Sequence, residues 1–325
     1  MSAIKITGEK RLVIVSGRAH PQLAEDIARE LESELVPTEA RTFANGEIYA
    51  RFDESIRGCD MFVIQSHTAP INEWLMEQLI MIDAAKRASA KRITVVAPYY
   101  PYARQDKKGR GREPISARLV ADLFKAAGAD RIMSVDLHAA QIQGFFDGPV
   151  DHLFAMPVLL EHFQSKLDAA KLTVVSPDMG RVRVADIWSD KLGAPLAIIH
   201  KRRDPLIPNK VTVHEIVGEV EGRTCLLVDD MIDTGRTIVK AAEALKAQGA
   251  TAVVVAATHA VFSPPAVDIL QSEFIDSVVV TDTLPIEQEK RWDRLTVLPI
   301  APLIARAIHE VFDDGSVTSM FDGAA

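Results

Sequence analysis

The chain has few of the residues that stabilise small secreted proteins or hold a chain in a membrane. It contains only two cysteines among 325 residues, Cys59 and Cys225, and their spacing matches neither a metal site nor a disulfide framework. No apolar run approaches the roughly 18 residues that a membrane-spanning helix needs. Residues 1–11 carry charge but no apolar stretch of signal-peptide type. We therefore expect a cytoplasmic protein with no membrane partner.

An excess of positive charge is also missing. The 37 Lys and Arg residues are outnumbered by 45 Asp and Glu residues, so the net charge is -8. Because long-range attraction to phosphate needs clustered positive charge, we expect no nucleic-acid partner. The hydrophobic fraction of 48% and charged fraction of 25% are ordinary for a globular chain and exclude disorder. A phosphorylated ligand would therefore need local cationic loops or a divalent metal.

Short β-rich runs alternate with Ala- and Leu-rich segments of helical spacing. The expected strands are residues 12–16, 61–65, 93–96, 132–136, 173–176, 225–229, 253–256 and 277–280. The expected helices include residues 21–35, 74–88, 116–127 and 237–248. The strand runs lack polar alternation, as expected of strands buried on both faces of a parallel sheet. The pattern predicts an α/β fold with ligands at the carboxyl ends of the strands.

An internal repeat predicts two related domains. Residues 116–139 and 237–260 each end a helix, cross a strand and reach a histidine, with Lys, Gly, Ala and His matching at one constant offset. A Gly-Ala pair after a helix is by itself a common C-cap, but the four matches together favour a duplicated domain. Prolines interrupt the pattern near residues 149–157. We expect domains of residues 1–152 and 153–325, the last stretch of which can pack back on the first domain.

The strongest chemical signal is Val-Asp-Asp-Met-Ile-Asp-Thr-Gly-Arg-Thr at residues 228–237. A strand followed by a short loop and a helix presents unpaired N–H groups and a positive dipole end, so a phosphate fits there. The hydroxyls of Thr234 and Thr237 add donors. Asp229 and Asp230 would accept hydrogen bonds from sugar hydroxyls or hold a hydrated Mg²⁺. An ordinary helix cap explains one polar residue here, but not three carboxylates and two threonines.

This run resembles the 5-phosphoribose motif of phosphoribosyltransferase-type folds. Residues 98–108, 112–117, 136–138 and 141–147 are similar to motifs of the class I ribose-phosphate diphosphokinase family, the phosphoribosyl pyrophosphate synthetases. The resemblance covers nearly the whole chain and implies two similar phosphoribosyltransferase-type domains. It also implies transfer of the β,γ-diphosphoryl group of ATP to the anomeric hydroxyl of ribose 5-phosphate. The products would be AMP and 5-phosphoribosyl 1-diphosphate, for nucleotide biosynthesis, with Mg²⁺ required.

On the second-domain side, the resemblance implies a ribose 5-phosphate site and a catalytic pair. The site would comprise Asp229, Asp230, Asp233, Thr234, Gly235, Arg236 and Thr237. Arg236 stands where related synthetases usually carry Gly, but the wider fold accepts a basic side chain there, so we expect the site to be retained. Lys201 and Arg203 match the pair that stabilises the transition state. Without the other motifs, that pair would be a plausible basic surface turn.

On the first-domain side, the resemblance implies that Arg104 and Gln105 bind ATP and that His138 meets both ATP and metal. Asp178 would be the second metal ligand, and a carboxylate opposite His138 would let one Mg²⁺ bridge the domains. From the residues alone, the basic run over 104–112 is as consistent with a solvated loop. A lone histidine after a strand is usually structural, and for His259 in the duplicate position we expect no chemistry.

Phe43, Asn45 and Glu47 resemble the segment that receives the adenine ring from a neighbouring subunit, which implies a homo-oligomer and, by resemblance, a hexamer. From the residues alone, a glycine turn between two strands is the favoured interpretation of this segment. Four further residues resemble the family's regulatory site for phosphate or ADP: Ser55, Arg57, Ser316 and Thr318. Thr318 stands where relatives often have Ser, and it still offers a hydroxyl.

Two other functions compete with the synthetase. A non-catalytic paralogue that regulates the active enzyme should have lost part of the catalytic loop or the metal ligands, whereas all of these residues are present here. A phosphoribosyltransferase that consumes the activated sugar would need only one domain and no ATP segment such as Arg104 and Gln105. These features favour the catalytic synthetase.

Overall fold

The computed structural model describes residues 10–202 and 213–321, and the chain divides into two compact units. The first unit comprises Met1–Phe154 together with Ala301–Ala325, and the second comprises Ala155–Ile300. The C-terminal stretch belongs to the expected domain of residues 153–325, for which we also expect that its last part can pack back on the first domain, and it groups with the first unit. The reason is the helix over Ala301–Phe312, which buries an apolar stripe against the first unit.

The first unit is built on a five-stranded parallel sheet in the order β1-β4-β5-β6-β7. Its strands are β1 (Leu12–Ser16), β4 (Asp60–Ile64), β5 (Arg92–Val96), β6 (Arg131–Val135) and β7 (Val150–Leu153). Strand β4 is buried along its whole length, which explains why its sequence lacks polar alternation.

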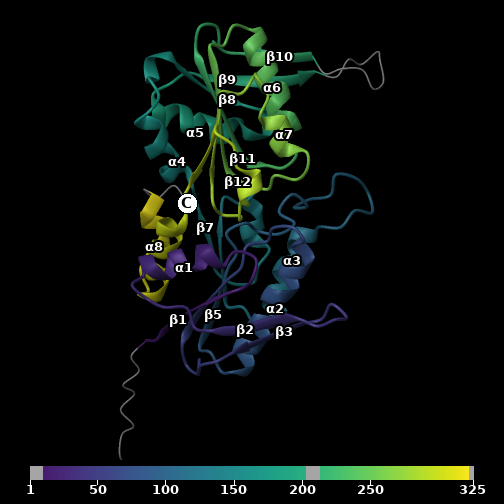
Figure 1. Ribbon diagram of the computed structural model, residues 1–325, viewed down its shortest axis with the longest axis vertical. Helices are drawn as coiled ribbons and strands as arrows, with labels where there is room; N and C mark the ends of the chain where they lie inside the picture. Colours follow the sequence, from purple (N-terminus) through teal and green to yellow (C-terminus); the bar gives the residue numbers. More distant parts are fainter. Residues whose placement is uncertain (1–9, 203–212, 322–325) are drawn as a thin grey trace, which may run out of the picture. The chain divides into compact units, whose positions relative to one another are not determined.

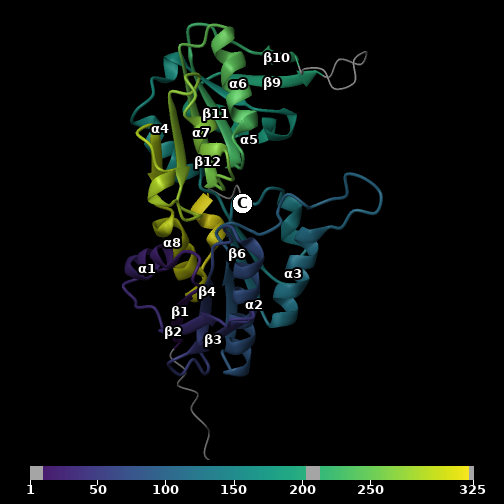
Figure 2. The ribbon, with the colours of Figure 1, turned by 45° about the vertical axis from the view of Figure 1, so that its right-hand side comes forward.

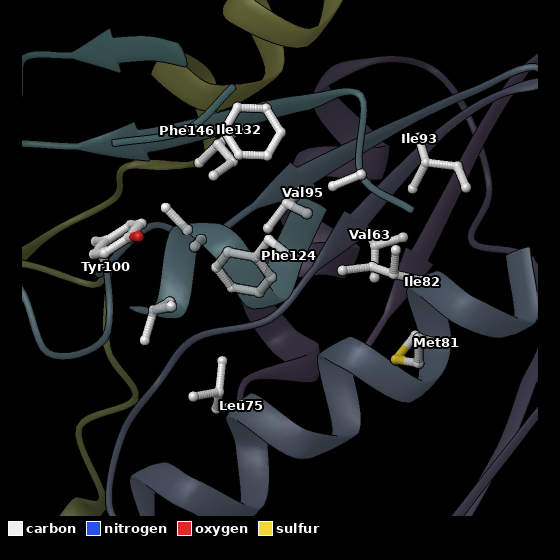
Figure 3. Packing of buried hydrophobic residues seen from close by; sticks show 14 of the residues in the cluster. Val63, Leu75, Met81, Ile82, Ile93, Val95, Tyr100, Phe124, Ile132 and Phe146 are labelled. Atoms are coloured by element: carbon white, nitrogen blue, oxygen red, sulfur yellow. The ribbon is translucent and has the colours of Figure 1, made fainter. Parts of the chain in front are cut away.

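Helices cover both faces of this sheet. They are α1 (Pro21–Glu30), α2 (Ile71–Arg87), α3 (Ser116–Ala127) and α8 (Ala301–Phe312). In Figures 1 and 2, α1 and α8 lie side by side on one face, and α2 and α3 lie on the other. Successive strand residues point to opposite faces. Figure 3 shows Val63 and Val95 packing toward Ile82 and Phe124 on the α2–α3 side.

A separate antiparallel pair lies outside this sheet, formed by β2 (Thr38–Thr42) and β3 (Ile48–Phe52). The turn between them is closed by hydrogen bonds from the Phe43 N–H to the Glu47 carbonyl (2.7 Å) and from the Gly46 N–H to the Phe43 carbonyl (2.8 Å). Gly46 adopts φ +90°, a conformation that favours glycine. The interpretation of this segment as a glycine turn between two strands is therefore confirmed.

The second unit contains a seven-stranded sheet in the order β10-β9-β8-β11-β12-β13-β14. Its strands are β8 (Leu172–Ser176), β9 (Leu196–Arg202), β10 (Val213–Val217), β11 (Thr224–Ile232), β12 (Ala252–Ala260), β13 (Ser277–Thr281) and β14 (Leu295–Leu298). All neighbours are parallel except the edge strand β10, which runs antiparallel to β9.

Helices flank this sheet as well. They are α4 (Met156–Gln164), α5 (Val182–Leu192), α6 (Arg236–Ala247) and the short α7 (Ala266–Leu270). In Figure 1, α4 and α5 lie on one side of the sheet and α6 and α7 on the other. Ile238 and Leu245 of α6 are buried against Leu227 and Val255 of the strands. The expected α/β class, with two similar domains of mostly parallel sheet, is confirmed.

The two copies of the internal repeat form the same local structure. Helix α3 leads into β6, and α6 leads into β12. A glycine with positive φ follows the end of each helix, Gly128 (+124°) directly after α3 and Gly249 (+84°) two residues after α6. The following residue then donates its N–H to the last turn, from Ala129 to Phe124 (3.0 Å) and from Ala250 to Leu245 (3.1 Å). The matching Gly-Ala pairs are thus helix C-caps that turn the chain into the next strand.

Among the residues that the structure describes, no helix has both the length and the apolar composition to cross a membrane. Both cysteines are buried and carry free thiols. Burial raises the pKa of each thiol, for Cys225 to about 11, so both are neutral at ordinary pH.

Candidate active site

The two carboxylates of the strongest motif lie on β11, close to its carboxyl end. We expected the strand to end at Asp229, but it continues to Ile232. The reason is that β12 is equally long and pairs with it up to Ile232 and Ala260. Asp229 and Asp230 are therefore held by a sheet ladder rather than by a loop. Only residues 233–235 separate the strand from α6.

Arg181 contacts both carboxylates. Its Nε lies 3.3 Å from Oδ1 of Asp229, and its Nη2 pairs closely with Oδ2 of Asp230. The arginine side chain is only 15% exposed, and those of Asp229 and Asp230 are 19% and 8% exposed. The sequence argument missed this arginine. Its place three residues after Asp178, in a loop that follows a strand end, was the only available signal.

The surroundings of Asp229 strongly change the pKa of its carboxyl group. Burial, followed by the charge of Asp230, raises the pKa of the Asp229 carboxyl well above its ordinary value, and Arg181 opposes the shift. Oδ1 of Asp229 also accepts a hydrogen bond from the backbone N–H of Asp230 at 2.9 Å. Two adjacent carboxylates in a part-buried site thus need a nearby cation to remain ionised together.

The loop over residues 233–235 is shaped for close approach to the α6 N-terminus. Gly235 is the N-cap, with φ +72°, and a Cβ there would lie 3.2 Å from Leu270 Cγ. Asp233 and Thr234 are half-buried. The side chains of Arg236 and Thr237 in the first turn are exposed. This geometry leaves free helix N–H groups and a positive dipole end available to an anion.

Asp178 lies in the loop after β8. Its Oδ1 accepts a hydrogen bond from the Gly180 N–H at 2.8 Å, and its backbone carbonyl accepts one from the Ser176 hydroxyl at 2.7 Å. The side chain is half-buried. These bonds shape the turn that carries Arg181. Of the other two residues expected in this unit, Lys201 belongs to β9 and Arg203 lies outside the described residues.

In the first unit, the basic run lies in a long irregular segment between β5 and α3. Arg104, Lys107, Lys108, Arg110 and Arg112 are all exposed. Gln105 accepts a hydrogen bond from the Ser116 hydroxyl at 2.6 Å, which attaches the segment to the start of α3. The buried Asp106 accepts a hydrogen bond from the Gln141 amide. Because Gln141 lies three residues after His138, this bond connects the basic segment with the chain after β6.

His138 is half-buried and lies just beyond β6. The chain turns there through Asp136, which has φ +38° and donates its N–H to the Leu153 carbonyl at 2.8 Å. The Leu137 N–H donates to Nε2 of His152 at 2.9 Å. The position of the His138 backbone is thus determined by contacts with β7.

The tip of the β2–β3 hairpin is exposed, including Phe43, Asn45 and Glu47. The Phe43 ring is 44% exposed, and the Arg41 guanidinium lies 5.5 Å from its centroid. Oδ1 of Asn45 accepts a hydrogen bond from the Glu47 N–H at 3.2 Å. An exposed aromatic ring beside amide and carboxylate groups is chemically suited to stack on a base.

The four residues assigned to regulation are all exposed and all belong to the first unit. Ser55 and Arg57 lie in the loop after β3, where the Ser55 carbonyl accepts a hydrogen bond from Arg11 at 2.6 Å. Ser316 and Thr318 lie in the short turn after α8.

The structure thus brings together the seven residues expected at the sugar site on β11, its loop and α6, and Arg181, which pairs with two of them, ends the turn that Asp178 caps. Within the described residues, no group of three or more His, Cys, Asp or Glu side chains is arranged to hold a metal ion.

Comparison with known proteins agrees with these features. Residues 12–128 match a family model described as the N-terminal domain of ribose phosphate pyrophosphokinase. Residues 205–322 match one described as a phosphoribosyl synthetase-associated domain.

Relatives match over almost the whole chain. The ribose-phosphate pyrophosphokinase of Streptomyces coelicolor is 66% identical over 322 residues, 99% of each chain. That of Mycobacterium leprae is 61% identical over 317 residues, 97% of each chain. The crystal structure of phosphoribosylpyrophosphate synthetase from Mycobacterium smegmatis aligns with a TM-score of 0.88 at 58% identity, covering 94% of this chain and all of that one. The chain belongs to the ribose-phosphate pyrophosphokinase family.

Proposed function

We propose that this protein transfers the β,γ-diphosphoryl group of ATP to the anomeric hydroxyl of ribose 5-phosphate, forming 5-phosphoribosyl 1-diphosphate and AMP. The observation that carries this proposal is the 66% identity over 99% of the chain to a ribose-phosphate pyrophosphokinase. The carboxylate pair, short loop and open helix N-terminus of the second unit support it, because they suit a sugar phosphate.

The sugar phosphate binds at the end of β11. The phosphate accepts hydrogen bonds from the backbone N–H groups around Gly235 and from the hydroxyls of Thr234 and Thr237, at the positive end of α6. Asp229 and Asp230 accept hydrogen bonds from the ribose hydroxyls, and Asp233 lines the same loop. Arg236, exposed on the first turn, adds a positive charge beside the phosphate.

ATP binds through residues of the first unit. Arg104 neutralises phosphate charge and Gln105, held by Ser116, contacts the nucleotide. Phe43 stacks on the adenine, and Asn45 and Glu47 recognise its exocyclic amine.

Positioning and charge neutralisation account for the chemical step. Transfer of a phosphoryl group needs an in-line arrangement and stabilisation of negative charge rather than a covalent enzyme intermediate. Lys201 and Arg203 supply positive charge that stabilises the negative charge of the diphosphoryl group in the transition state of its transfer.

His138 and Asp178, both half-buried, are the residues that we propose would hold Mg²⁺, and the carboxylate of Asp178 offers the oxygen donor that this ion prefers. The ion, when bound, neutralises the charge of the phosphates.

The protein is proposed to act in the cytoplasm as a homo-oligomer, a hexamer in analogy with its family, in which the hairpin tip serves a neighbour. Ser55, Arg57, Ser316 and Thr318 are proposed to bind phosphate or ADP as a regulatory site. Sedimentation of the purified chain measures the assembly directly.

The decisive experiment is the formation of AMP by the purified protein. We expect AMP from ATP only when ribose 5-phosphate and Mg²⁺ are both present, with one phosphoribosyl diphosphate formed per AMP. Absence of AMP under these conditions would favour the regulatory paralogue. Activity with a nucleobase and preformed phosphoribosyl diphosphate, but not with ATP, would identify a phosphoribosyltransferase instead.

A further inference from the structure

The ion pairs of Arg181 give the sugar site a cation that belongs to the protein. The guanidinium contacts Asp229 through Nε (3.3 Å) and Asp230 through Nη2, so one planar group spans both carboxylates. A single point charge such as an ammonium cannot reproduce this two-point geometry. The arginine thereby determines how the two carboxylates are oriented relative to each other.

Arg181 is itself held firmly in place. It is the last residue of the turn that Asp178 shapes through its bond to the Gly180 N–H, and α5 begins at the next residue, Val182. Its side chain is only 15% exposed, so it has little room for other rotamers. The guanidinium is therefore a preformed part of the site.

The charge balance shows what Arg181 contributes. Asp229 and Asp230 are two adjacent acidic groups in a part-buried place, and the guanidinium of Arg181 adds one positive charge in contact with both. Without it, the two carboxylates would repel each other, take up a proton or separate. A pair in any of these states is a poorer acceptor for neutral hydroxyl groups, because the acceptor oxygens are protonated or displaced.

We propose that Arg181 is a positioning residue for ribose 5-phosphate: through its two ion pairs it holds Asp229 and Asp230 in a fixed orientation, so that the sugar hydroxyls bind without a divalent cation at the pair. The inference rests on the proposed function, since it assigns the sugar to these carboxylates. It predicts that a divalent cation can replace the guanidinium when the arginine is removed, because one such ion, unlike an ammonium group, can be coordinated by both carboxylates at once.

The test measures ribose 5-phosphate binding by calorimetry, without ATP, in a chelator and again with Mg²⁺. The variants are Arg181→Gln, which keeps the length but removes the charge, and Arg181→Lys, which keeps one charge but loses the two-point contact. Arg183→Gln is the matched control, because Arg183 lies two residues away and is exposed. Thermal unfolding of each variant verifies that it is folded.

In chelator we expect Arg181→Gln to bind the sugar phosphate about tenfold more weakly than the wild type, as for loss of a hydrogen bond to a charged group. Mg²⁺ should restore most of this loss in Arg181→Gln while changing wild-type binding much less. Arg181→Lys should fall between the two, and Arg183→Gln should match the wild type.

Three results would overturn the inference: Arg181→Gln binding as tightly as the wild type in chelator, no selective rescue by Mg²⁺, or a wild type that binds the sugar phosphate only with Mg²⁺. Failure of the proposed function is distinct, because the wild type would then make no AMP from ATP, ribose 5-phosphate and Mg²⁺. If Arg181→Gln does not fold, binding by Arg181→Lys equal to the wild type would overturn the inference, and a loss rescued by Mg²⁺ would support it.

Discussion

His138 of the first unit and His259 of the second occupy the same place in the internal repeat, yet their surroundings differ. His259 lies within β12, is 1% exposed and shares a hydrogen bond of 2.9 Å with Thr283 through Nδ1. His138 lies beyond β6 and is half-buried. The difference comes from strand length, since β12 has nine residues and β6 has five.

The neighbouring strands explain this difference in length. In the second unit, β11 continues to Ile232 and so offers β12 a partner at Met231 for His259. In the first unit, β5 ends at Val96, and the chain leaves the sheet in the long basic segment. His259 is covered because β11 and β12 both continue past it, whereas β5 and β6 end before the matching positions, so His138 lies beyond the strands and is half-buried. Equivalence in a sequence repeat thus does not imply equivalence in surroundings.

The largest expected effect tests whether the second unit determines the turnover rate while the first unit binds the nucleotide. Lys201→Ala, in the second unit, should lower kcat by roughly 10²–10³-fold with little change in KM, because its charge is most useful in the transition state. Asp233→Ala should mainly raise KM for ribose 5-phosphate, and Arg104→Ala, in the first unit, KM for ATP. Steady-state kinetics with both substrates varied measures all three.

Lys240→Ala, on the exposed side of α6, is the control for loss of one positive charge in the second unit. A Lys201→Ala enzyme with normal kcat and altered affinity alone would contradict the assigned role.

The next effect concerns stability in acid. As the pH falls, buried groups in the two units should change the free energy of unfolding in opposite directions. His67, after β4, is buried, and burial lowers its pKa to about 4. Because the unfolded chain takes up this proton near pH 6.5, the first unit should lose about 3 kcal/mol of unfolding free energy between pH 6.5 and 4. The raised pKa of Asp229 acts oppositely, since its destabilising charge disappears as the pH falls.

Urea unfolding from pH 4 to 7 measures these slopes, and His67→Gln removes the titrating group. The variant should show a shallower loss of stability in acid than the wild type. An unchanged slope would mean that His67 is not the group that limits the first unit at low pH.

A paired substitution of the repeat histidines tests the comparison directly. His138→Ala should lower kcat/KM for ATP by about ten- to a hundredfold and change the unfolding temperature less than His259→Ala does, because the side chain is half-buried and is proposed to contact the nucleotide. His259→Ala should do the reverse, destabilising by about 2 kcal/mol through a cavity and the lost partner of Thr283. Equal losses of activity in both variants would break the distinction.

The smallest effect compares the segment after β5 with the loop after β11, each of which leads into a helix of the internal repeat. Gly235→Ala should destabilise the second unit by about 1–2 kcal/mol, because φ is +72° and the new Cβ would lie 3.2 Å from Leu270. Gly111→Ala, in the basic segment, has no atom within 4 Å of its Cβ and should be neutral. Thermal unfolding compares the two variants, and an equally tolerant Gly235 would show that the short loop is not sterically constrained.

Much of the fold followed from local patterns. The apolar runs at residues 12–16 and 225–229 predicted buried strands, since only parallel strands covered on both faces need side chains without polar alternation. The Gly-Ala pairs at Gly128 and Gly249 predicted helix ends, because the backbone there needs positive φ. The local structure of the motif at residues 228–237 could likewise be predicted from the sequence, because its residues are consecutive and lie on one strand, one loop and one helix.

Tertiary structure alone decided the long-range partnerships. The sequence suggested that the last stretch can pack back on the first domain, but not that α8 lies beside α1, and nothing near Asp229 indicated that Arg181 pairs with it. By itself the sequence determined which segments are strands, helices and turns, because those depend on backbone preference and burial within a few residues. Which histidine is covered and which charges meet depends on contacts between segments far apart in the chain, and these exist only once the sheets have assembled.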